Sequence, residues 1–166
     1  MDFEKKEYRT DDEKYMIEAL REAQKAAQAD EVPVGAVIVK DGEIIAAAHN
    51  RVEAGKSSSA HAEMIAIAKA EMQLGSKWLN GAVLYVTLEP CCMCAGSMVL
   101  ARISRLVIGA KDPKSGACGS VINVVNNNNL NHRIDVTTGV LEEECSRQLT
   151  EFFRRKRDTN NTEEIN

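Results

Sequence analysis

The chain has 166 residues, of which 44% are hydrophobic and 28% charged, and its formal net charge of −4 is ordinary for one globular domain. It has no apolar run of membrane-spanning length and its first residues are charged, so we expect neither a transmembrane helix nor a secretory signal peptide. Five cysteines without such a signal argue against a disulfide framework and for the cytoplasm, and a nucleic-acid partner would need a local basic patch.

Turn signals and periodic apolar runs predict five strands and four main helices. Runs rich in β-branched residues predict strands, in chain order, at 34–39, 43–48, 82–87, 106–110 and 134–138. Apolar residues at helical spacing predict helices at about 10–29, 61–75, 91–100 and 142–157. The Asp41-Gly42 pair predicts an antiparallel hairpin between the first two strands. A helix between the third and fourth strands predicts that these two pair in parallel.

Local capping signals and the chain's end refine this order. Thr10 and Glu13 form a capping-box pattern at the first helix. Residues 51–60 are expected to form a polar connection, in which any of the serines at 57–59 could cap the following helix. Residues 158–166 are polar and expected to be disordered, which leaves 1–157 as a single domain. The order of elements fits an α/β fold with a mixed sheet between helices.

Two short motifs carry the candidate chemistry. His61-Ala62-Glu63 opens one expected helix, and Pro90-Cys91-Cys92-Met93-Cys94 opens another at the end of a buried strand. Cysteines three apart share one face of a helix, and Pro90 suits a helix start because its missing N–H would be unpaired there. Imidazole and thiolate are the ligands that zinc prefers, so His61, Cys91 and Cys94 are the expected ligands.

Three ligands leave one coordination position for water, which is typical of a catalytic rather than a structural zinc site. Glu63 is then the candidate general acid and base that handles the protons of that water. Cys92 points elsewhere and is expected to be a small buried apolar residue. The alternative is a structural zinc knuckle, or a histidine at a helix start near two core cysteines.

The H-x-E and P-C-x-x-C pattern resembles the zinc-dependent nucleoside and nucleobase deaminases. Four further runs resemble the bacterial tRNA-specific adenosine deaminase family, from about residue 11 to 157: Glu31-Val32-Pro33-Val34-Gly35-Ala36-Val37, Thr87-Leu88-Glu89-Pro90-Cys91, Asn131-His132-Arg133 and Phe152-Phe153-Arg154. The resemblance implies a three-layer α-β-α sandwich of the cytidine-deaminase-like type, with one Zn²⁺ per subunit. It also implies a homodimer.

For function, the resemblance implies hydrolytic deamination of adenosine to inosine at the wobble position of a tRNA anticodon stem-loop, by zinc-activated water with Glu63 as proton shuttle. Matched to the family, Asn50 would contact the purine and Asp112 would lie near the target nucleotide. Phe153, with Arg154 and the cations after it, would meet the anticodon loop. Aromatic and basic residues together suit single-stranded RNA, although they also suit an amphipathic helix with a basic end.

Two competing functions remain open at this point. A deaminase of free bases or nucleosides would share the zinc site but would not need the basic C-terminal helix. A non-catalytic, zinc-stabilised RNA-binding module would bind RNA without releasing ammonia. Glu63 argues against this second alternative, because a structural zinc site has no use for an adjacent carboxylate.

Overall fold

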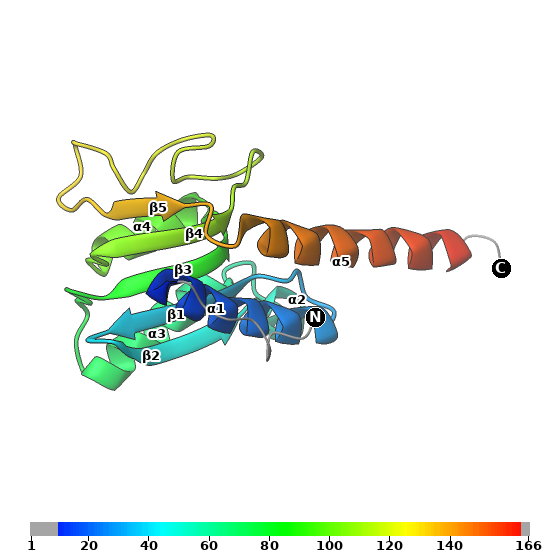
Figure 1. Ribbon diagram of the computed structural model, residues 1–166, viewed down its shortest axis with the longest axis horizontal. Helices are drawn as coiled ribbons and strands as arrows, with labels where there is room; N and C mark the ends of the chain where they lie inside the picture. The colour runs from blue at the N-terminus through cyan, green and yellow to red at the C-terminus, as the bar shows by residue number, and fades with distance from the viewer. Residues whose placement is uncertain (1–9, 164–166) are drawn as a thin grey trace.

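A computed structural model describes residues 10–163, with side chains described to Thr159. A five-stranded sheet of order β2-β1-β3-β4-β5 lies between two layers of helices (Figure 1). The strands are β1 (Gly35–Lys40), β2 (Glu43–His49), β3 (Val83–Leu88), β4 (Arg105–Ala110) and β5 (Asp135–Thr138). The helices are α1 (Asp11–Gln28), α2 (Val52–Gly55), α3 (Ala62–Leu74), α4 (Cys92–Leu100) and α5 (Glu142–Glu163).

The sheet is mixed, as the sequence predicts. β1 pairs antiparallel with both β2 and β3, whereas the β3–β4 and β4–β5 pairs are parallel. Asp41 and Gly42 join β1 to β2 with φ angles of 51° and 79°, the left-handed values that a tight hairpin turn requires. The expected hairpin and the expected parallel pair are therefore both confirmed.

Successive side chains of the central strands point to opposite faces of the sheet, which produces one hydrophobic core on each face. In β1, Ala36 and Ile38 face α3 and α4, whereas Val37 and Val39 face α1. β4 alternates in the same way, and all of these side chains are buried. Apolar residues at consecutive positions are thus explained by a strand that is covered on both faces.

Helix α1 and the first turns of α5 pack on one face of the sheet, and α3 and α4 cover the other (Figure 1). A Cβ on Gly35 would collide with the backbone of Ala19, so glycine lets α1 lie directly on β1. Gly109 similarly lets Cys145 of α5 approach β4. Beyond that contact, α5 extends well past the sheet. No helix within residues 10–163 combines the length and the apolar character that crossing a membrane would need.

The structure differs from several sequence expectations. The connection at 51–60 contains the short helix α2. None of the three serines caps α3: its N-cap residue is His61, which makes no side-chain capping bond. Cys92 is exposed rather than buried. Helix α5 continues to Glu163, so residues 158–163 are helical, and the remainder of the expected disordered tail lies outside the described residues.

Candidate active site

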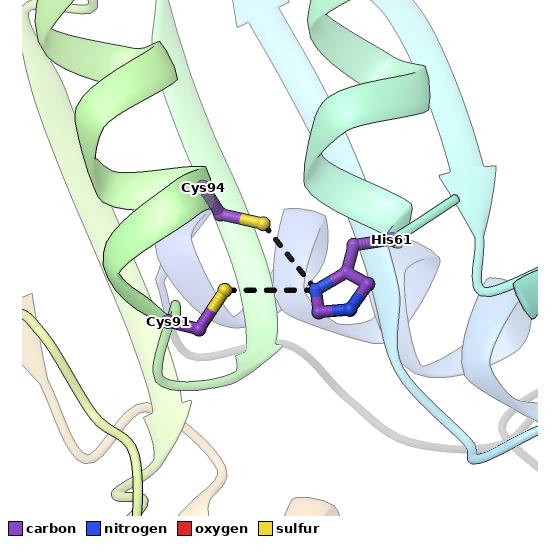
Figure 2. A group of neighbouring side chains, drawn as sticks. All are labelled: His61, Cys91 and Cys94. Carbon is purple, nitrogen blue, oxygen red and sulfur yellow. Dashed lines mark hydrogen bonds between the residues drawn. The ribbon is translucent and has the colours of Figure 1, made fainter. Parts of the chain in front are cut away.

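Two helix N-termini on the same side of the sheet bring the predicted metal ligands together. His61 is the N-cap residue of α3, Cys91 is that of α4, and Cys94 lies in the first turn of α4. Figure 2 shows the three side chains turned toward one another from these helix tips. The Sγ atoms of Cys91 and Cys94 lie 3.7 and 3.5 Å from Nδ1 of His61.

Packing against the sheet explains why the helix tips meet. Strand β3, at the centre of the sheet, ends at Leu88 and delivers Pro90 and Cys91 directly to the start of α4. Helix α3 packs on β1 and β2 and also contacts α4. Small buried residues, Ala62 and Ala66 on α3 and Ala95 on α4, occupy this side of the sheet and leave room for the two helices to approach.

The donor set fits a metal ion with an open coordination position. One ligand atom from each of His61, Cys91 and Cys94 lies within 4.8 Å of the others, and no fourth His, Cys, Asp or Glu side chain within residues 10–159 joins this group. Burial lowers the pKa of His61, which favours the neutral imidazole that metals bind. Burial, with Glu63 and Cys91 nearby, raises the pKa of the Cys94 thiol. The helix dipole alone therefore does not make Cys94 a thiolate, and metal binding must displace its proton.

Glu63 lies beside this group, in the first turn of α3, and is only 3% exposed. Its carboxyl forms a hydrogen bond with the Cys94 thiol. Burial raises the pKa of Glu63 to about 7, although hydrogen bonds from its own backbone N–H and from the Cys94 thiol lower it in part. Glu63 also lines the cleft with His61 and Cys91, so its carboxyl can exchange protons with a molecule bound there.

A cleft of about 760 Å³ opens beside the ligand group, a volume within the range of small-molecule sites. It is bounded by the end of α1, by α2, by the chain after β4 and by α5. Cys94 is fully buried next to it. The cleft brings together most of the predicted site residues: Asn50, His61, Glu63, Cys91, Asp112 and Phe153.

Of the predicted site residues, the buried Cys94 lies beside this cleft, whereas Arg154 lies away from it. It lies instead in a separate hollow of about 370 Å³ between α5 and the outer face of α1, beside Gln24 and Gln28. Phe153, its neighbour, faces the cleft and is 44% exposed. Successive residues on a helix point about 100° apart, which separates the two side chains.

Two buried glutamates in the cleft lining, Glu31 and Glu89, were not assigned a role from the sequence. Glu31 accepts hydrogen bonds from the backbone N–H groups of Glu53 and Ala54, at 3.1 and 2.7 Å, and so holds the start of α2. Each glutamate lies close to a proline that leads into or out of a strand end, Pro33 and Pro90. The available signal was a charged residue directly beside an apolar segment that contains or meets a proline.

Comparisons with known proteins agree with this geometry. Residues 10–157 match the model of the MafB19-like deaminase family. The tRNA-specific adenosine deaminase of Bacillus subtilis (strain 168) is 53% identical over 148 residues, which cover 89% of this chain and 92% of that protein. The corresponding protein of Aquifex aeolicus (strain VF5) is 49% identical over 146 residues, or 88% and 96% of the two chains.

Among solved structures, one from a study of A-to-I editing by tRNA:A34 deaminases superimposes with a TM-score of 0.79 and 46% identity, covering 82% of this chain and 99% of that one. A guanine deaminase from Nitrosomonas europaea matches with a TM-score of 0.70 and 27% identity over 84% and 83% of the chains. Fold and site together define a deaminase of the cytidine-deaminase-like class, which confirms the predicted fold. The chain belongs to the MafB19-like deaminase family and, within it, to the tRNA-specific adenosine deaminases.

Proposed function

We propose that this protein is a zinc-dependent hydrolase that deaminates adenosine to inosine at the wobble position of a tRNA anticodon. The observation that carries the proposal is the buried carboxyl of Glu63 beside an open His61–Cys91–Cys94 group in a cleft. Identity of 53% with a tRNA-specific adenosine deaminase supports the choice of substrate.

His61, Cys91 and Cys94 are the residues that would hold the metal, one ion per chain. Zn²⁺ is the expected ion, because one imidazole and two thiolates form a soft, tetrahedral donor set. When bound, zinc supplies Lewis acidity and lowers the pKa of a coordinated water to about 7.

Glu63 performs the proton transfers in this mechanism. It accepts a proton from the attacking water and delivers it to the N1 nitrogen of the adenine ring, while the water oxygen bonds to C6. A second proton then passes through Glu63 to the amine on C6. The C6–N bond breaks, ammonia leaves, and inosine remains. General acid–base steps of this kind each contribute about 10²–10⁴-fold to the rate.

The remaining cleft residues hold the nucleotide. Asn50 contacts the purine, and Asp112 lies near the target nucleotide. Phe153 is exposed at the cleft and offers a surface on which an unpaired base of the anticodon loop stacks. Arg154 faces a separate hollow, so its contact would be with RNA that extends beyond the cleft.

Three further parts of the proposal follow from the family. All residues given a role fall within residues 1–157, which we propose form one catalytic domain. The active form is a homodimer. Light scattering should therefore give a mass twice that of the 18.2 kDa chain. A tRNA substrate implies that the enzyme acts in the cytoplasm.

A deaminase of free bases is the second candidate, because the guanine deaminase from Nitrosomonas europaea shares the fold over 84% of this chain. The decisive experiment incubates the metal-loaded protein separately with an arginine tRNA anticodon stem-loop bearing adenosine at the wobble position, with free adenosine and with guanine. We expect inosine in the stem-loop and no change in the two small molecules. Turnover of guanine with an unmodified stem-loop would instead establish the second candidate.

A truncated protein separates the same alternatives through α5. Removal of residues 152–166 takes away Phe152 and Phe153, which line the cleft, and all the basic residues that follow them. An RNA deaminase should lose activity on the stem-loop, whereas a free-base deaminase should keep its turnover. RNA binding without ammonia release by the full chain would indicate a non-catalytic zinc module.

A further inference from the structure

Glu89 forms an unusual concentration of hydrogen bonds at the edge of the cleft. It is 4% exposed and directly precedes Pro90 and Cys91. Its Oε1 atom accepts from the backbone N–H groups of Cys118 and Ser120, each at 3.0 Å. Its Oε2 atom accepts from the backbone N–H of Asp112 at 3.0 Å and from the Ser120 hydroxyl. One carboxylate therefore satisfies four donors.

All four donors belong to one loop, residues 111–120, which follows β4. The same loop meets the strand end again where the backbone N–H of Ala117 donates to the carbonyl of Pro90 at 2.8 Å. A Cβ on Gly116 would collide with the Glu89 carboxyl, so the loop backbone wraps closely around this side chain. The loop is thus built around Glu89 and joined to the turn that carries Cys91.

This loop is one wall of the cleft, through Asp112 and Ser115. The Asp112 carboxylate accepts from the backbone N–H groups of Lys114 and Ser115, at 2.9 and 3.2 Å, and from the Ser115 hydroxyl at 2.5 Å. Its orientation in the cleft therefore depends on the conformation of the loop. Glu31 holds α2 in a similar way, so two buried carboxylates each support a different part of the cleft lining.

We propose that Glu89 is a positioning residue for the reaction: it sets the Asp112 loop relative to Cys91 and so orients the nucleotide held between that loop and the metal ligands. It acts through the loop and not by contact with the reacting atoms. A carboxylate is required because every partner is a donor. Glutamine would turn an NH₂ group toward a backbone N–H and leave buried donors unpaired, which is costly. The proposal rests on the deamination of a bound nucleotide proposed above.

The experiment compares Glu89→Gln, Ser120→Ala and Asp12→Asn with the unaltered protein. Ser120→Ala removes one of the four donors and serves as the milder variant, should Glu89→Gln fold poorly. Asp12→Asn is the matched control, because Asp12 pairs with Arg105 on the opposite face of the sheet. Metal content, amide hydrogen exchange of residues 111–120 and the separate kcat and KM for the stem-loop are measured for each.

We expect Glu89→Gln to retain its metal, to exchange faster at residues 111–120, and to show a KM about tenfold higher with a smaller change in kcat. Ser120→Ala should change in the same direction by a smaller factor. Asp12→Asn should lose thermal stability without either change. If Glu89 only stabilised the fold as a whole, exchange would become faster throughout the protein. Faster exchange confined to residues 111–120 would show that Glu89 acts on this loop.

Two results would overturn the inference: unchanged exchange and KM in Glu89→Gln, or a loss of activity that follows loss of metal and is restored by added zinc. The exchange measurement needs no substrate. If the unaltered protein leaves the stem-loop unmodified, the proposed function fails, whereas the effect of Glu89 on the loop is still decided by exchange.

Discussion

Asn50 accepts a hydrogen bond on its side-chain oxygen from the backbone N–H of Ala62, at 2.9 Å. This bond satisfies a free donor at the start of α3, where the N-cap residue His61 provides no side-chain cap. Asn50 is buried and lines the cleft. Its oxygen therefore holds the helix that carries His61 and Glu63, and its NH₂ group remains as a donor for a ligand.

Substitution of Asn50 can separate these two tasks. Asn50→Asp keeps an oxygen to cap α3, and a negative charge at a helix N-terminus is favourable, so thermal stability should be largely retained. The amide donor is lost, and kcat/KM for the stem-loop should fall about 10- to 100-fold, the effect of one missing hydrogen bond to substrate. Asn50→Ala should lose both stability and activity. Equal stability and equal activity of all three proteins would contradict the two-task interpretation.

Glu63→Gln tests the proton transfers. The variant keeps the size of the side chain and leaves His61, Cys91 and Cys94 unaltered, so metal content measured by atomic absorption should remain one ion per chain. Turnover of the stem-loop should fall by at least about 10³-fold, because an amide cannot accept the proton. A metal-loaded variant that works within a few-fold of the normal rate would remove Glu63 from the mechanism.

The metal ligands are tested by a pair of cysteine variants. Cys94→Ala removes a buried member of the ligand group and should abolish both metal retention and activity. Cys92→Ala is the matched control, because Cys92 is exposed and outside the group, and it should retain both. Chelation of the unaltered protein should lower its melting temperature, and added zinc should restore it. Equal metal content in the two variants would refute the assignment.

Phe153 and Arg154 are adjacent but face different hollows, so their alanine variants should differ. Phe153→Ala removes a stacking surface in the cleft and should raise KM about 5- to 150-fold, which corresponds to about 1–3 kcal/mol per stacked base. Arg154→Ala should raise KM only a few-fold, and this difference from the unaltered protein should disappear at high salt. Titration of stem-loop binding at two salt concentrations checks both. A larger effect from Arg154→Ala would place the main RNA contact in the α1–α5 hollow.

Asp12 lies on the face of the sheet that α1 covers, and its ion pair predicts how the free energy of unfolding changes with pH. Arg105 donates to both Asp12 oxygens, at 2.8 and 2.7 Å, and Tyr85 donates at 3.0 Å. The Arg105 hydrogen bond holds the pKa of Asp12 below its ordinary value, although burial opposes the shift. A carboxyl with a depressed pKa stabilises the fold above the unfolded-state pKa, and this contribution is lost as the pH falls through the lower folded-state pKa.

Asp12→Asn should therefore lower stability by about 1–2 kcal/mol at neutral pH, and the difference should shrink as the pH falls below about 4. Denaturant melts of the two proteins between pH 3 and pH 8 measure it. A difference that grows on acidification would mean that Asp12 is not a stabilising carboxylate.

Features encoded by neighbouring residues were predictable from the sequence. The strand–turn–strand unit around Asp41-Gly42, the cap at Thr10 and the approach of Cys91 and Cys94 at the start of α4 all depend on contacts within a few positions. His61 is distant in the sequence from the two cysteines. It could be assigned to the same site only because one imidazole and two thiolates are a typical ligand set for zinc.

What the sequence did not predict depends on contacts between distant positions. The cap of α3 comes from Asn50, twelve positions away, and not from the adjacent serines. Glu31 and Glu89 reach 22 to 31 positions along the chain for their partners. Cys92 is exposed, and Arg154 faces a separate hollow, because of how α4 and α5 pack, which local sequence does not determine.

Cys91 and Cys94 form a C-x-x-C dithiol at the start of α4, with sulfurs within 4.8 Å of each other. Thiol–disulfide oxidoreductases also place a C-x-x-C pair at a helix start, but burial raises the pKa of the Cys94 thiol here, which makes this pair slower to oxidise. In aerated solution, dioxygen can oxidise the metal-free pair to a disulfide, which removes two of the three ligands. Bound metal thus also protects the thiols, and metal-free preparations should require a reducing agent before they can be reconstituted.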